Sequence, residues 1–293
     1  MTAQIFAIIA PVFLIAAIGF AWARAKMPFD HNMVSALVLN VGAPCLLLSQ
    51  LLTHPIRLDL MAEIIAAGVG VMSLSALGGI LLVRALRLPV RAYLPVLIFP
   101  NVGNMGLPLC FFAFGDVGLA LAVAYFAVVS LFQFSLGIGI ASGRFGINLL
   151  LRNPVMWSLP LAMILLGTDT AVPAWIMNTL TIGGSFAIPL MLMSLGTSLA
   201  TLSVRSLGRA MGFSVARIFG GFAVALAVTA ALGLEGSARG AVLIQSSMPA
   251  AVFNYLFAVR YGNAASDVAG IVLTSTVLSF LTLPLLLAYV LGG

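Results

Sequence analysis

Charged residues are scarce in this chain, and acidic residues are the scarcest of them. Only 7% of the 293 residues are charged, and Asp and Glu together number seven. A soluble domain covers itself with charged and polar side chains because its outside faces water. Here 62% of the residues are hydrophobic and the mean hydropathy is +1.21. The composition therefore excludes a soluble domain and predicts an integral membrane protein.

The sequence also lacks the patterns of metal sites, disulfide frameworks and intramembrane enzymes. Cys45 and Cys110 each lie inside an apolar segment without a CxxC motif, which indicates buried helix thiols. There is no HExxH motif, no GxSxG with a partner and no pair of buried aspartates, so we expect neither catalytic residues nor a metal or cofactor. His31 and His54 fall in predicted loops and receive no role. No loop has room for the output domain of a signalling receptor.

What is present is a succession of apolar runs, each near the roughly 20 residues that a membrane-spanning helix needs. They predict ten transmembrane helices at about 4–23, 32–52, 60–83, 92–114, 117–141, 153–168, 173–200, 207–232, 238–259 and 266–291. In the first stretch the positive charges follow the apolar run, which favours a membrane helix over a cleaved signal peptide.

The basic residues lie in the short gaps and set the orientation. The side that begins with the N-terminus holds Arg57 and Arg239. The opposite side holds ten basic residues: Arg24, Lys26, Arg84, Arg87, Arg91, Arg144, Arg152, Arg205, Arg209 and Arg260. By the positive-inside rule the second side is cytoplasmic, so both termini are extracytoplasmic in a cell (inner) membrane. No basic tract with interleaved aromatics points to nucleic acid.

The two halves resemble each other in order. Pro11-Val12 corresponds to Pro154-Val155, and Val96-Leu97-Ile98 to Val242-Leu243-Ile244, with an offset of 143 to 146 residues. The segment APCLLLS at 43–49 aligns with IPLMLMS at 188–194 between these matches. Five helices per repeat invert the second copy, and such inverted repeats are typical of secondary transporters. We therefore expect repeats at 1–145 and 146–293, with a scaffold and a transport domain each drawn from both.

Two segments in corresponding positions are interrupted. The fourth reads LIFPNVGNMGLPLCFF, in which Pro100 and Pro108 break the helix and Gly103 permits non-helical angles,. The ninth reads LIQSSMPAAVFNYLFA and breaks at Pro249. Pro44 and Pro189 predict milder kinks in the second and seventh helices.

Half-helix N-termini that meet at membrane depth suit an anion such as a carboxylate. The alternative is that these prolines and glycines only kink their helices. If the breaks form the site, the candidate substrate-binding residues are Asn101, Gly103, Asn104, Gln245, Ser246, Ser247 and Asn254.

The stretches LIFPNVGNMGLPL, RNPVMWSLPLAMILLG, IPLMLMSLGTSL and SSMPAAVFNYLFAVRYG resemble the auxin efflux carrier family, in its bacterial members related to plant PIN-type exporters. The resemblance implies a 5+5 inverted repeat like that of sodium/proton antiporters and bile acid symporters, with crossed helices four and nine. It also implies elevator-type transport of a carboxylate such as malate, malonate or an auxin-like acid. It assigns the substrate carboxylate to Asn101 or Asn104 and leaves that choice open.

Two charged residues lie about one turn or more inside predicted helices. Glu63 is a candidate for proton coupling, with a solvated interfacial glutamate as the alternative. Arg217 either pairs with the substrate anion or extends its head to the cytoplasmic interface. None of the acids lies in a crossover, which argues against a cation antiporter. A sodium-coupled organic anion symporter remains the alternative, and proton or sodium coupling, a homodimer and the direction of transport are left open.

Overall fold

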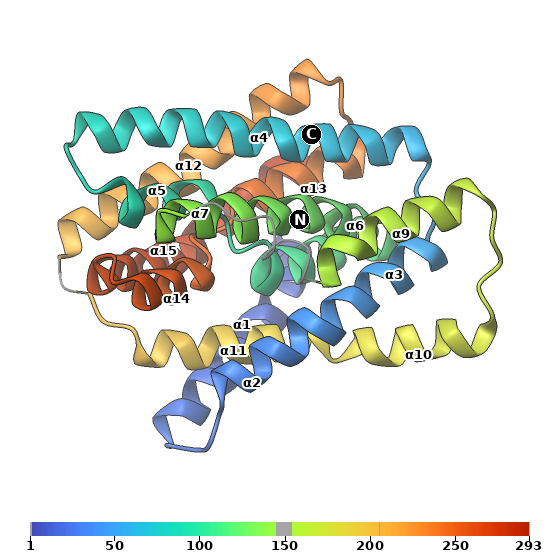
Figure 1. Ribbon diagram of the computed structural model, residues 1–293, viewed down its shortest axis with the longest axis horizontal. Coiled ribbons are helices and arrows are strands. Elements are labelled where there is room, and N and C mark those ends of the chain that lie inside the picture. The colour runs from blue at the N-terminus through green and yellow to red at the C-terminus, as the bar shows by residue number, and fades with distance from the viewer. Residues whose placement is uncertain (1, 145–153, 205, 293) are drawn as a thin grey trace.

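The computed structural model describes residues 2–144, 154–204 and 206–292 (Figure 1). Arg152, Arg205 and the predicted repeat boundary at 145/146 lie outside them. Within these ranges the chain is helical apart from short turns and one isolated β-bridge. The helices are α1 (Thr2–Arg24), α2 (His31–Leu37), η1 (Val38–Gly42), α3 (Ala43–Thr53), α4 (Leu58–Ala85), α5 (Val90–Ile98), η2 (Val102–Gly106), α6 (Leu107–Phe132), η3 (Gln133–Gly137), α7 (Ile138–Ser142), α9 (Pro154–Gly167), α10 (Ala174–Ser185), α11 (Ala187–Thr201), α12 (Leu207–Ala231), α13 (Gly236–Ser246), α14 (Val252–Tyr261) and α15 (Ala265–Gly292), where η marks π-helices.

Seven helical stretches among the described residues are long and apolar enough to cross a bilayer. They are Thr2–Arg24, His31–Thr53, Leu58–Ala85, Val102–Ser142, Ala174–Thr201, Leu207–Ala231 and Ala265–Gly292. The 41-residue stretch Val102–Ser142 contains Gly115 at φ 65° and ψ −153°, a conformation that glycine adopts readily. This kink coincides with the predicted boundary between the fourth and fifth segments. The composition therefore predicted the all-helical membrane class correctly.

The fourth and ninth predicted segments are each split in two. Helix α5 ends at Ile98, the backbone is extended at Phe99, and the chain turns helical again at Val102. Helix α13 ends at Ser246, and α14 begins at Val252. The breaks surround Pro100 and Pro249, because a proline offers no amide hydrogen and disfavours helical angles in the residue before it.

The other marked prolines lie in the first turn of a helix. Pro108 is the second residue of α6 and Pro44 the second of α3, and each follows directly on a π-helix, η2 or η1. The expectation that Pro108 breaks the fourth helix is therefore wrong. The wider π-turn precedes a proline in the first turn of the α-helix, where its missing amide hydrogen costs least. Pro189 lies in the first turn of α11, after α10 ends next to Phe186.

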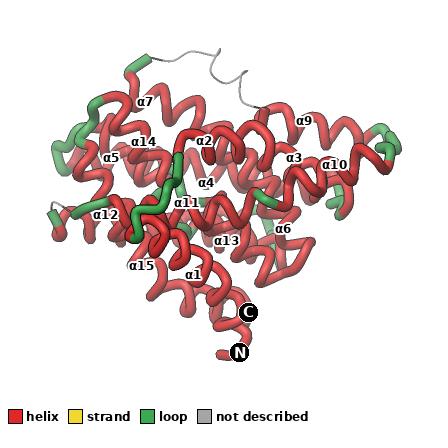
Figure 2. The backbone as a smooth tube through the Cα atoms, turned by 90° about the horizontal axis from the view of Figure 1, so that it is seen from below, coloured by secondary structure: helices red, strands yellow, loops and turns green. Residues whose placement is uncertain are grey.

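Close helix packing places these elements around the two breaks. Helices α6 and α13 lie side by side, α12 packs on α15, and α1 packs on α11. A Cβ on Gly19 or Gly196 would collide with the backbone of the opposite helix, so α1 and α11 approach at glycine,. Figure 1 shows α4 along one edge and α10–α11 along the opposite edge, with α6 and α13 between them. Figure 2 shows that loops form only a small part of the chain.

Candidate functional site

The two broken helices are bonded to each other at their breaks. The Asn101 amide donates to the Pro249 carbonyl at 2.7 Å, and the Ala251 amide donates to the Phe99 carbonyl at 3.0 Å. Together they form an antiparallel bridge between Pro100 and Ala250. We call the segments 99–101 and 247–251 the crossing. Mutual pairing satisfies backbone groups that lipid could not.

A cavity of about 270 Å³ opens beside the crossing. The crossing and α14 form one wall, α6 and η3 another, and α2, η1 and α11 face them. Its lining comprises His31, Val34, Ser35, Val38, Leu39, Pro100, Asn101, Val102, Gly103, Asn104, Phe126, Ser130, Gln133, Phe134, Met191, Ser194, Ser198, Thr201, Leu202, Ala251, Val252, Phe253, Tyr255 and Leu256. Three of the seven predicted binding residues, Asn101, Gly103 and Asn104, are among them.

Two amide side chains in this lining are buried and have a nitrogen without a partner. Asn101 is 4% exposed, and its Oδ1 accepts a hydrogen bond from the Asn104 amide at 3.3 Å, while its Nδ2 has no partner. Gln133 is also 4% exposed, and its Nε2 has no partner. Leaving such donors unpaired costs free energy, so both nitrogens are suited to a bound acceptor.

Two helix N-termini bring partial positive charge to the cavity wall,. The half-helices that begin at Val102 and Val252 both start in its wall. The first amides of a helix precede its hydrogen-bond ladder and carry partial positive charge. No Asp, Glu, Lys or Arg occurs among the described residues of the lining. Amide donors and helix ends can therefore hold an anion there, since no carboxylate opposes it.

The four predicted residues of the ninth segment do not line the cavity. Gln245 donates from Nε2 to the Ala122 carbonyl at 3.1 Å, and Ser247 donates to the Leu243 carbonyl at 2.7 Å. The Ser246 hydroxyl is 2.7 Å from the Tyr125 hydroxyl, and Asn254 Nδ2 donates to the Phe99 carbonyl at 3.2 Å. The Gln245 and Ser246 contacts join α13 to α6, and the Asn254 contact joins α14 to the first broken helix at Phe99. The Ser247 bond is local to the end of α13.

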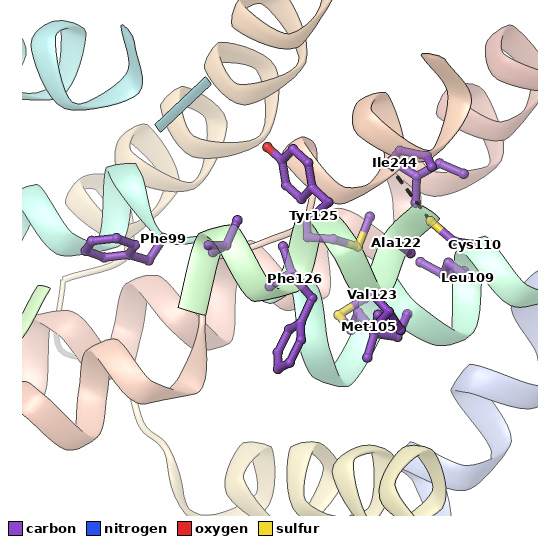
Figure 3. Close-up of a cluster of buried hydrophobic side chains, with 14 of the residues drawn as sticks. Phe99, Met105, Leu109, Cys110, Ala122, Val123, Tyr125, Phe126 and Ile244 are labelled. Atoms are coloured by element: carbon purple, nitrogen blue, oxygen red, sulfur yellow. Dashed lines mark hydrogen bonds between the residues drawn. The ribbon is translucent and has the colours of Figure 1, made fainter. Parts of the chain in front are cut away.

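Figure 3 shows Tyr125 and Phe126, neighbours on α6, leaving the helix in different directions. Tyr125 is directed to the Ser246 side, and Phe126 lines the cavity. One turn of α6 thus serves both the packing and the cavity wall.

The two candidate charged residues also lie away from the cavity. Arg217 is 1% exposed and donates to backbone carbonyls of Leu97, Ile98 and Ser246. Its guanidinium thus reaches neither the cavity nor the membrane surface, because it is held by these carbonyls. Glu63 is exposed on α4.

Several residues of the cavity lining were not predicted from the sequence. Ser194, Ser198 and Thr201 follow the i, i+4, i+7 spacing of one helix face in an otherwise apolar segment,. That stripe of hydroxyls was a usable signal. Gln133 offered less: it begins the π-helix η3, and such π-turns are frequent at functional sites but cannot be read from sequence. His31 begins α2 rather than lying in a loop.

Comparison with known proteins gives a consistent family. The model of a family described as "Membrane transport protein" matches residues 4–146 and 140–287. An uncharacterized transporter of Methanothermobacter thermautotrophicus is 28% identical over 193 residues, and one of Methanocaldococcus jannaschii is 25% identical over 199 residues. Each match covers 63% of this chain, and the chain spans 63% of the length of each relative.

Proposed function

Since the chain belongs to the membrane transport protein family, the auxin efflux carriers, we propose that it is a secondary transporter of a small organic anion. The anion binds in the cavity beside the crossing. The observation that carries this is the unpartnered Nδ2 of Asn101, a residue of the cavity lining that caps the half-helix beginning at Val102. The family supports transport rather than enzymatic activity.

A carboxylate fits the polar part of the cavity. Its two oxygens accept several hydrogen bonds at once, and bonds from neutral donors to a charged acceptor are stronger than those to a neutral one. Asn101 Nδ2 and Gln133 Nε2 are side-chain donors without a partner, and the N-terminal ends of the two half-helices add partial positive charge,.

The remaining lining sets the size and character of the substrate. A volume of about 270 Å³ lies just below the usual range of ligand pockets, roughly 300–1,000 Å³. Phe126, Phe134, Met191, Phe253 and Leu256 give the cavity apolar walls. The volume limits the substrate to a small molecule, and the apolar walls favour a carboxylate with an apolar body, such as an auxin-like acid, over the dicarboxylates malate and malonate.

We further propose ten membrane crossings arranged as a 5+5 inverted repeat. Loops that this topology assigns to one side contact each other. His54 is 3.6 Å from Asp116 on the extracytoplasmic side, while Arg209 is 2.9 Å from Asp267 on the cytoplasmic side. The cavity lies between the crossing on one side and helices α2, η1 and α11 on the other. An elevator-type displacement of the crossing against these three helices would carry the anion across the membrane.

Uptake into proteoliposomes containing the purified protein tests the proposal. We expect saturable movement of at least one acid from a panel of aromatic and aliphatic mono- and dicarboxylates, under an imposed proton or sodium gradient. Liposomes without protein are the control, and comparison of the two gradients identifies the coupling ion. Absence of uptake for the whole panel under both gradients would contradict the proposal.

A further inference from the structure

Arg217 is a buried arginine that the cavity does not use. It lies within α12 and is 1% exposed. Gly221, one turn further along α12, gives it room, because a Cβ there would collide with Arg217 Nη2 and with the Ser246 carbonyl. Burying a full charge is costly unless it is well hydrogen-bonded.

The partners of Arg217 share one property: they are the last carbonyls of two half-helices. Nη1 donates to the carbonyls of Leu97 and Ile98, the latter at 3.0 Å, at the end of α5. Nη2 donates to the carbonyl of Ser246, the last residue of α13. The C-terminal end of a helix carries partial negative charge, so the guanidinium joins the two negative ends.

No carboxylate pairs with Arg217 within residues 2–144, 154–204 and 206–292. The contacts between basic side chains and carboxylates there are Arg57–Asp59, Arg209–Asp267 and His54 beside Asp116, and none of them includes Arg217. Each C-terminal helix end is equivalent to about half a negative charge. The two ends together thus amount to about one negative charge, which one guanidinium balances.

The opposite side of the crossing has no such balance. The half-helices that begin at Val102 and Val252 place two positive ends at the cavity, where the described lining holds no charged Asp, Glu, Lys or Arg. We propose that Arg217 is the charge-balancing, positioning residue of the crossing. It neutralises the negative ends of α5 and α13, so that the positive ends opposite act on a bound anion without opposition. This inference rests on the proposed anion site.

A thiol placed in the cavity measures this potential without any substrate. In a Cys45→Ala, Cys110→Ala background, Asn104→Cys puts a thiol at the first turn of η2, and its alkylation by neutral iodoacetamide is followed against pH. With Arg217 present we expect the midpoint of the pH–rate profile below about 8.5, the ordinary thiol value. Arg217→Gln should raise the midpoint by about 1 pH unit, whereas Arg217→Lys should leave it nearly unchanged.

The control thiol is Thr168→Cys, in an exposed turn away from the crossing. Its midpoint should not respond to Arg217→Gln, and an equal response there would overturn the proposal. An unchanged midpoint at position 104 in a folded Arg217→Gln protein would also overturn it. If that variant does not fold, a midpoint at or above about 8.5 in the Asn104→Cys protein with Arg217 intact decides against it. The thiol assay contains no substrate, so its outcome does not depend on whether transport is detected. Failure of this inference can therefore be told apart from failure of the proposed function.

Discussion

Asn101 illustrates how a single side chain can be oriented for binding by its own backbone. Its Oδ1 accepts a hydrogen bond from the Asn104 backbone amide, and this bond determines which end of the side-chain carboxamide remains free. The free end is Nδ2, buried in the cavity wall. Of the two asparagines that the sequence could not separate, Asn101 therefore has the stronger case for contacting the anion, while Asn104 contributes its backbone amide to the orientation.

We expect Asn101→Ala to weaken carboxylate binding by about ten- to a hundredfold, because a hydrogen bond to a charged group is worth about 1.5–3 kcal/mol. Isothermal titration with an acid that the transport panel identifies measures the change. Asn40→Ala is the matched control, since Asn40 donates to the Ala36 carbonyl and lies outside the cavity lining. Equal affinity of the Asn101→Ala and wild-type proteins would remove Asn101 from the site.

What could be predicted at this scale depended on whether the signal was local. Asn101, Gly103 and Asn104 stand beside a proline, so the break and its polar neighbours are visible in one short stretch. Gln133 has no such neighbour, and it meets the cavity only through the packing of η3 against distant segments. Gln245 was predicted to bind substrate but does not line the cavity, because its side-chain amide donates to the Ala122 carbonyl, 123 residues away.

At the scale of helices, the α1–α11 contact depends on the absence of side chains. A methyl group on Gly196 would collide with the Ala16 carbonyl. We expect Gly196→Ala to destabilise the protein by about 1–3 kcal/mol, the usual range for overpacking, and to lower the thermal unfolding midpoint in detergent. Gly212→Ala in α12 is the control, because nothing lies within 4 Å of its added Cβ. That control should be neutral or slightly stabilising.

Helix α15 supports the crossing directly. The Ala250 amide donates to Ser275 Oγ of α15 at 3.1 Å. We expect Ser275→Ala to cost about 1–3 kcal/mol, because it leaves a buried amide without a partner. Ser279→Ala, one turn further along α15, removes only a bond to the Thr276 carbonyl of the same helix. Denaturation in detergent should therefore rank Ser275→Ala as the less stable variant, and the reverse order would contradict this role.

Helix positions were the most predictable level of the fold. Apolar length alone placed most boundaries within a few residues, because a bilayer imposes a minimum span. The π-turns before Pro44 and Pro108 were not predictable, since a proline is compatible with a kink, a break or a helix start. Arg217 shows the same limit: its carbonyl partners lie 29, 119 and 120 residues away, a distance at which sequence spacing carries no information.

For the whole molecule, the proposed topology makes a direct prediction about the two membrane faces. In a protein without native cysteines, Thr168→Cys should react in intact cells with a membrane-impermeant maleimide, because its loop is assigned to the extracytoplasmic side. Ser206→Cys is the matched exposed position on the basic side and should react only after the cells are opened. Labelling of Ser206→Cys in intact cells would contradict the proposed topology, because it would show either the reverse orientation or a different number of crossings.

Helix breaks are usually thought of as hinges, but the bridge between Pro100 and Ala250 gives this crossing the opposite mechanical character. Two backbone hydrogen bonds join segments from opposite halves of the chain. Neither broken helix can therefore bend at its break without rupturing a hydrogen bond to the other. Flexing must then occur outside the crossing. In hydrogen–deuterium exchange, the amides of Asn101 and Ala251 should consequently exchange as slowly as those inside the surrounding helices.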